Sequence, residues 1–191
     1  MEINFDIRYS AHPQDVKGYD TERLRRQYLI GKVFGKDEIN LTYTLHDRMI
    51  AGGAMPVSEA LELKPVEILR AGSFLERREM GIFNVGGEGT VQAGDRVYRM
   101  KYKEALYLGR GDRKITFGSS DPASPAKFYF CCAPAHTSYP DHLTTREDAV
   151  HMELGSLEES NHRVINRMIV KEVVPTCQLQ MGMTELKPGS T

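Results

Sequence analysis

The sequence has no excess of charge of one sign and no long apolar run. Its 25 basic and 26 acidic side chains give a formal net charge of −1 at pH 7, so we expect no nucleic-acid partner. Nowhere do the roughly 18 consecutive apolar residues of a membrane-spanning helix occur. The first residues mix charged with isolated apolar side chains, unlike a signal peptide. We therefore expect neither export nor a membrane partner.

Cysteine is scarce and poorly placed for disulfide bonding. Cys131, Cys132 and Cys177 are an odd number of cysteines, and neighbouring cysteines do not readily bond with each other. Reduced thiols in a cytoplasmic protein are the simpler interpretation.

Short β-rich segments fill most of the remaining sequence. Hydrophobic residues make up 40% of the 191 residues, which is enough for a core. Strands bounded by glycine or charge are expected at 39–45, 80–85, 89–93, 96–100, 105–108, 114–117 and 127–133. One helix is expected over 21–30, capped by Asp20 and stopped by Gly31. Many short strands with Gly-rich turns predict a sandwich or barrel of jelly-roll type.

The ends of the chain differ from this central part. Residues 1–18 contain His12 and Pro13 and no sustained period, which predicts an arm. The polar residues 141–162 predict a surface linker. Further strands are expected over 163–170 and 177–186. Because so few strands leave backbone groups unpaired, this second series is interpreted as cut short.

The stretch Phe74–Val91 resembles the 5-keto-4-deoxyuronate isomerases, the ketol-isomerases of pectin and uronate breakdown. Four further stretches agree in order and spacing, at 46–56, 122–129, 133–140 and 176–186. The resemblance covers the chain from about Tyr28 to its end.

This resemblance implies an all-β bicupin, of which the chain holds the first half and the opening of the second. Residues 19–140 would form a first cupin without metal ligands, and residues 163–191 the opening strands of a truncated second cupin. The family's zinc site of three histidines and a glutamate is then expected beyond Thr191. If Glu79 takes the place of a cupin glutamate, Ser73 and Leu75 stand where histidines belong, and Lys114 replaces the last histidine.

Two other candidate sites involve the cysteines, and for both the alternative is that the residues only pack. A zinc site built from Cys131, Cys132, His136, His142 and His151 is conceivable but lacks metal-binding spacing. A Cys–His nucleophile lacks any marker of an oxyanion hole. The alternative is that the two neighbouring cysteines lie on opposite sides of one strand.

Arginines are the candidate substrate-binding residues. Arg77 and Arg78 stand in a charge cluster before a strand, and Arg163 and Arg167 flank another. A guanidinium grips a planar carboxylate with two parallel hydrogen bonds, which suits a uronate. The alternative is a structural ion-pair network. No catalytic residue and no metal ligand is predicted within the chain.

The function implied by the resemblance is interconversion of 5-dehydro-4-deoxy-D-glucuronate and 3-deoxy-D-glycero-2,5-hexodiulosonate, an intramolecular oxidoreduction with zinc as cofactor. The partners would be a small uronate substrate and further copies of the chain, which the arm of residues 1–18 is a candidate to reach. This chain alone is expected to bind no zinc and to show no turnover. The alternative is a metal-free degenerate cupin acting as a scaffold or sugar-binding module.

Overall fold

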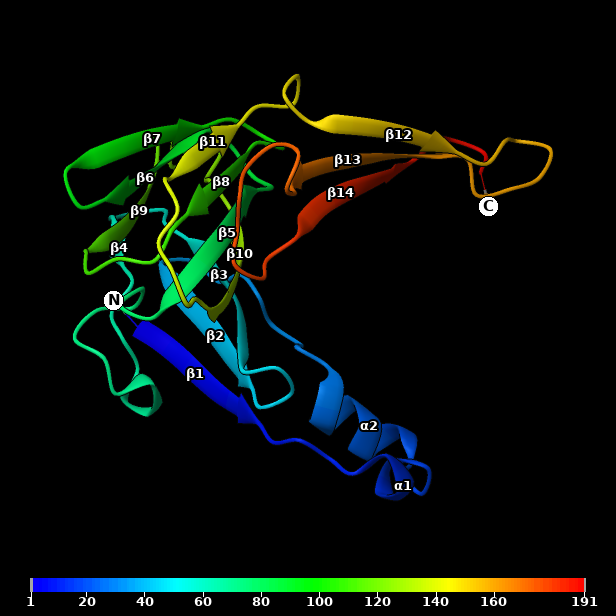
Figure 1. Ribbon diagram of the computed structural model, residues 1–191, viewed down its shortest axis with the longest axis horizontal. Helices are drawn as coiled ribbons and strands as arrows, with labels where there is room; N and C mark the ends of the chain where they lie inside the picture. Colours follow the sequence, from blue (N-terminus) through cyan, green and yellow to red (C-terminus); the bar gives the residue numbers. More distant parts are fainter. Residues whose placement is uncertain (1, 191) are drawn as a thin grey trace.

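The computed structural model describes residues 2–190. Strands dominate it, as the sequence predicts (Figure 1). The strands are β1 (Glu2–Arg8), β2 (Glu38–Thr44), β3 (Met49–Met55), β4 (Leu61–Glu62), β5 (Arg78–Asn84), β6 (Gly89–Ala93), β7 (Arg96–Met100), β8 (Ala105–Leu108), β9 (Ile115–Ser119), β10 (Phe128–Pro134), β11 (His142–Thr144), β12 (Val150–Leu154), β13 (Arg163–Ile169) and β14 (Met181–Leu186). The helices are α1 (Pro13–Val16), α2 (Thr21–Tyr28) and the 3-10 turn η1 (Glu67–Leu69). None of the helices within residues 2–190 has the length and apolar character needed to cross a membrane.

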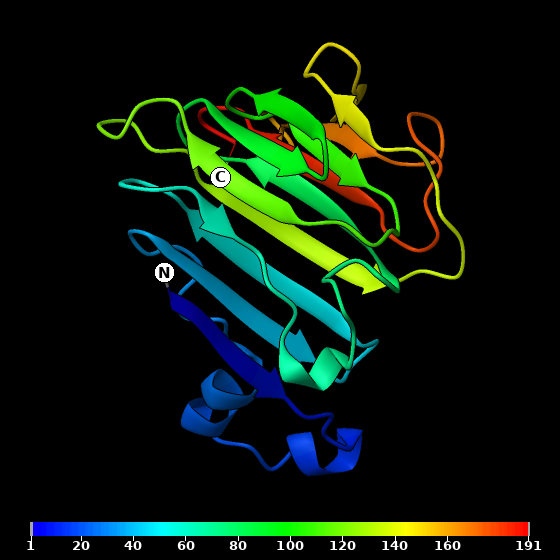
Figure 2. The same cartoon turned by 90° about the vertical axis from the view of Figure 1, so that its left-hand side faces the viewer.

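Two sheets face each other across the main core (Figure 2). One sheet has the strand order β1-β2-β3-β10-β5-β8-β11, and the other has the order β4-β9-β6-β7. Aromatic side chains fill the space between them: Phe117 stacks on Phe130 at 5.7 Å between ring centroids and lies 5.3 Å from Phe128. All three are fully buried, so the sandwich interior is a packed core.

A third sheet, β12-β13-β14, lies against the outer face of the seven-stranded sheet and projects from it (Figure 1). Near the body of the molecule, Met168 and Ile169 pack with Phe83 and Tyr107 in a second core. Strand β5 therefore has two buried faces: Met80 and Ile82 belong to the main core, while Phe83 belongs to the second. This position between two cores explains why every residue of β5 is buried.

The all-β fold class is confirmed, and several details differ from expectation. The helix over Thr21–Tyr28 is capped by Asp20, whose side chain accepts from the N–H of Arg23 at 2.7 Å, as predicted. The short helix α1 is an addition. Strand β14 begins only at Met181, because residues 177–180 turn to meet β5 instead of pairing.

The predicted arm and linker both contain strands. Residues 2–8 form β1, which pairs in parallel with β2 of the same chain. Within 141–162, β11 pairs with β8 and β12 pairs with β13. All three strands lie at the margins of their sheets, and β11 has only three residues, so neither burial on both sides nor length gives them a strong signal in the sequence.

Candidate functional site

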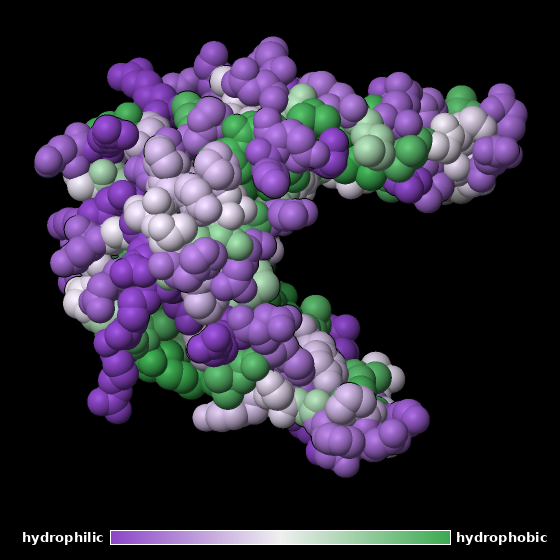
Figure 3. Space-filling model, viewed as in Figure 1, coloured by the Kyte–Doolittle hydropathy of each residue, from purple (hydrophilic) through white to green (hydrophobic). Residues whose placement is uncertain are grey.

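A groove opens between the outer face of the seven-stranded sheet and β14. Its cavity measures about 530 Å³, a volume typical of small-molecule sites. The lining residues come from β5, β10, β14 and the segment after α2, and they are Val33, Phe34, Phe83, Val85, Tyr129, Cys131, Gln180, Met181, Gly182 and Met183. The space-filling view is hollowed between the projecting third sheet and the helices (Figure 3). The walls of the groove are therefore mainly apolar, with few polar groups.

Tyr129 and Cys131 supply two of those polar groups. The Tyr129 hydroxyl lies 3.1 Å from the Cys131 sulfur. Burial raises the pKa of the Tyr129 phenol and also that of the Cys131 thiol. Both groups are consequently neutral near pH 7, and they suit hydrogen bonding to a ligand better than nucleophilic attack.

The neighbouring cysteines lie on opposite faces of β10, as strand alternation predicts. Cys132 belongs to the main core, whereas Cys131 packs with Leu179 on the outer face. Burial raises the pKa of the Cys132 thiol well above its usual range. Because their side chains point apart, these cysteines do not combine into one metal site.

The groove borders a second cavity that carries positive charge. This cavity, of about 560 Å³, shares Gln180 with the groove and is lined also by Arg167, Val170, Lys171 and Glu172. One terminal nitrogen of Arg167 lies 3.5 Å from a Glu172 oxygen. The Arg167 Nε is buried and finds no hydrogen-bond acceptor among residues 2–190. Arg167 thus lines the cavity with a guanidinium whose one ion pair is long.

The other three candidate arginines bond to backbone carbonyls. Arg77 donates to two carbonyls at turn η1, at 2.6 and 2.7 Å. Arg78 is buried and donates to the carbonyl of Arg48 at 2.8 Å. Arg163 donates to the carbonyl of Asn161 at 3.0 Å, on the projecting sheet. The four arginines thus occupy separate surroundings, and their role in substrate binding stays a prediction.

Glu79 is a residue whose role the sequence did not indicate. Its carboxylate is fully buried and accepts the Tyr107 hydroxyl at 2.7 Å. It also accepts three successive backbone N–H groups, from Cys177 at 2.7 Å, Gln178 at 2.6 Å and Leu179 at 2.8 Å. Burial and this carboxylate raise the pKa of the Tyr107 phenol. Glu79 therefore ties the segment before β14 to β5.

The Glu79 side chain does not take the place of a cupin metal ligand inside the sandwich. It points to the outer face, because Met80 and Ile82, its neighbours in the strand, face the sandwich core. Leu75 is also part of that core, and Lys114 pairs with Glu62 at 2.7 Å. Within residues 2–190, no three His, Cys, Asp or Glu side chains gather as metal ligands. The described residues therefore do not fit a zinc ion.

Comparison with known proteins relates the chain to one family. The model of the KduI/IolB family matches residues 29–191. The chain belongs to the KduI/IolB family. A Bacteroides fragilis relative named 4-deoxy-L-threo-5-hexosulose-uronate ketol-isomerase is 60% identical over 190 residues, which cover 100% of this chain and 68% of the relative. An Escherichia coli relative of the same name is 44% identical over 187 residues, covering 97% and 67%.

The fold agrees with this membership. A crystal structure of an IolB-like protein from Salmonella typhimurium aligns with a TM-score of 0.50 at 14% identity. The alignment covers 66% of this chain and 46% of that one. At this identity the likeness supports the fold alone, and it agrees with the all-β architecture of facing sheets.

Proposed function

We propose that this chain serves a ketol-isomerase that interconverts 5-dehydro-4-deoxy-D-glucuronate and 3-deoxy-D-glycero-2,5-hexodiulosonate in pectin and uronate catabolism. The observation that carries the proposal is the 60% identity, over all of this chain, to a protein named for that activity. The match spans all of this chain and therefore covers the residues that line the groove.

The chemistry sets what the site must do. A ketol isomerisation moves a proton between adjacent carbons through an enediol, so the substrate must be held with both carbons near an acid or base. The Arg167 guanidinium, beside Lys171, would bind the substrate carboxylate. The apolar walls of the groove would exclude water, and the neutral Tyr129 hydroxyl would donate to a substrate oxygen.

Zinc remains a proposal that rests on the sequence resemblance. Since the described residues do not fit the metal, no step of the mechanism is assigned to it. Assembly into a homo-oligomer and a cytoplasmic location are proposed on similar grounds, the latter supported by three free thiols.

A metal-free sugar-binding module is the second candidate function. Two observations favour it: the sandwich interior is filled by aromatic side chains, and the charged cavity beside the groove is built without a metal-ligand cluster in residues 2–190. Such a module would bind a uronate through Arg167 without converting it.

Turnover and binding measured on the same preparation separate these functions. Conversion of 5-dehydro-4-deoxy-D-glucuronate would be followed by proton NMR, binding by calorimetry, and zinc per chain by mass spectrometry. Conversion, by this chain or by a chimera that joins it to the remaining part of the Bacteroides fragilis relative, supports the isomerase, and binding without conversion by either protein supports the module. If the chain neither binds nor converts the uronate, both are wrong.

Two variants test the proposed contact in either case. Arg167→Gln should weaken uronate binding about tenfold or more, because it removes a charged hydrogen-bond donor. Arg99→Gln, at an exposed position on β7 of the other sheet, is the matched control and should bind normally.

A further inference from the structure

Strand β1 ends the seven-stranded sheet and leaves one edge without a neighbour in the part of the chain described. Its only sheet partner there is β2. Figures 1 and 2 both place β1 at the margin of the sheet. An edge strand with unpaired N–H and C=O groups is a template for pairing with another chain.

The direction of one carbonyl shows which backbone groups face that edge. The Arg8 carbonyl accepts from the N–H of Leu45, just after β2, at 2.8 Å. Because backbone groups alternate in direction along a strand, Asn4 and Asp6 also direct theirs toward β2. Ile3, Phe5 and Ile7 therefore direct their N–H and C=O groups outward.

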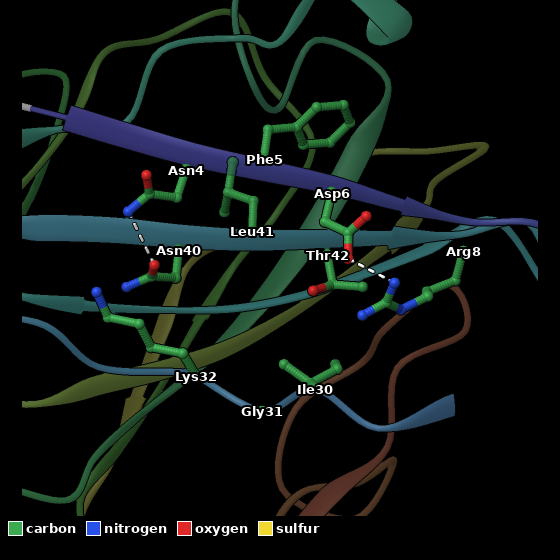
Figure 4. A pocket seen from close by; sticks show the side chains of 10 residues that line it. All are labelled: Asn4, Phe5, Asp6, Arg8, Ile30, Gly31, Lys32, Asn40, Leu41 and Thr42. Carbon is green, nitrogen blue, oxygen red and sulfur yellow. Dashed lines mark hydrogen bonds and ion pairs between the residues drawn. The ribbon is translucent and has the colours of Figure 1, made fainter. Parts of the chain in front are cut away.

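The side chains of β1 alternate in the same register. Ile3, Phe5 and Ile7 are only partly buried against the main core. Asn4 and Arg8 lie on the opposite face, where Asn4 donates to Asn40 at 3.0 Å and Arg8 pairs with Asp6 at 2.7 Å (Figure 4). In the space-filling view, apolar surface is visible over β1 (Figure 3). The edge thus combines free backbone groups with incompletely covered apolar side chains.

We propose that β1 pairs antiparallel with β1 of a second copy, about a two-fold axis at Phe5. In this register Phe5 faces Phe5, Ile3 faces Ile7, and Asn4 faces Asp6. The apolar residues are also those whose backbone groups point outward, so each of their pairs exchanges both N–H···O=C bonds. In a two-fold interface both copies contribute the same surface. The two seven-stranded sheets would then form one continuous sheet.

Backbone pairing and charge together select this register over its neighbours. The two-fold at Phe5 brings Ile3, Phe5 and Ile7 all into hydrogen-bonded pairs and opposes no like charges. A shift of two residues in one direction opposes Asp6 with Asp6, and in the other direction it leaves Ile7 without a partner among residues 3–7. A shift by one residue opposes outward backbone groups with groups already bonded to β2. The strand sequence is self-complementary in one arrangement.

The first test is the mass of the assembly in solution, by light scattering after gel filtration. Ile3→Pro removes an outward N–H while leaving the pairing with β2 intact, a position where edge strands accept proline. Ile3→Val keeps the N–H and is the matched control. The proposal expects wild type and Ile3→Val to share one mass and Ile3→Pro to show half of it, with unchanged circular dichroism. A monomeric wild type, or an Ile3→Pro variant of unchanged mass, would overturn the proposal.

The second test reads the register by disulfide cross-linking in a Cys177→Ser background. Phe5→Cys should cross-link to itself, because the two positions meet on the axis at a distance that suits a disulfide. Ile3→Cys and Ile7→Cys should each stay uncross-linked alone and cross-link when mixed. Cross-linking of the single Ile3→Cys variant, or none by Phe5→Cys, would show that the register is wrong.

Discussion

Glu79 accepts a hydrogen bond from the backbone N–H of Leu179, which lies 100 residues further along the chain, at 2.8 Å. The N–H groups of Cys177 and Gln178 converge on the same carboxylate. Three donors from one turn satisfy a buried charge that has no cation beside it among these contacts, and Tyr107 supplies a fourth. One side chain of the first sheet therefore positions the segment that leads into β14, the wall of the groove.

Replacing this carboxylate should loosen that segment. Glu79→Gln places an amide NH₂ against backbone donors, so we expect the free energy of unfolding to fall by about 3 kcal/mol in urea titrations. Tyr107→Phe removes one neutral donor and should cost about 1 kcal/mol. Glu88→Gln, at an exposed position, is the control and should leave stability unchanged. Equal stability of Glu79→Gln and Glu88→Gln would show that the contacts contribute nothing net.

The packing of β14 on β5 depends on Gly81. A Cβ at this position would collide with the sulfur of Met181 and lie 2.8 Å from Cδ1 of Ile169. Gly81→Ala should therefore push the third sheet outward and lower stability by about 1–3 kcal/mol. Gly31→Ala is the control, because nothing lies within 4 Å of its added Cβ. Limited proteolysis after residue 170 should be faster in Gly81→Ala, and an unchanged digestion rate would contradict the close contact.

The sequence predicts local structure better than it predicts which distant segments meet. Strands such as β6 and the cap at Asp20 have signals within a few residues. The alternation of Ile3, Phe5 and Ile7 is a period-two signal for β1, but it is confined to one short segment with no sustained period around it. Glu79 could not be recognised in this way, because its partners are backbone N–H groups, which every non-proline residue carries. The place of Arg167 beside a strand and the uronate substrate implied by the resemblance predict a binding role, whereas only the fold shows the cavity that it lines.

The three thiols should differ in reactivity in the native protein. Cys131 and Cys132 are buried, and burial raises the pKa of each thiol, so few thiolates form near pH 8. Cys177 is only partly buried, with its sulfur 3.5 Å from the carbonyl of Thr137. A disulfide reagent should therefore modify one thiol rapidly, and Cys177→Ser should remove that fast phase. A fast phase that persists in Cys177→Ser would show that the groove exposes Cys131.

Asp37 should make stability depend on pH in the acid range. Its carboxylate accepts the backbone N–H groups of Ser58 and Val57, both at 2.7 Å, and these bonds lower the pKa of Asp37 from 3.8 to about 2. A pKa depressed by folding stabilises the native state above the unfolded value, and that contribution disappears as pH falls from about 4 to about 2. Asp37→Asn should accordingly have a lower Tm than wild type at pH 6, with the difference closing toward pH 2. Asp47→Asn is a matched control, since Asp37 and Asp47 share a φ of 55° and Asp47 is exposed. A Tm difference for Asp37→Asn that is the same at both pH values would mean that the side chain acts through its shape and not through its charge.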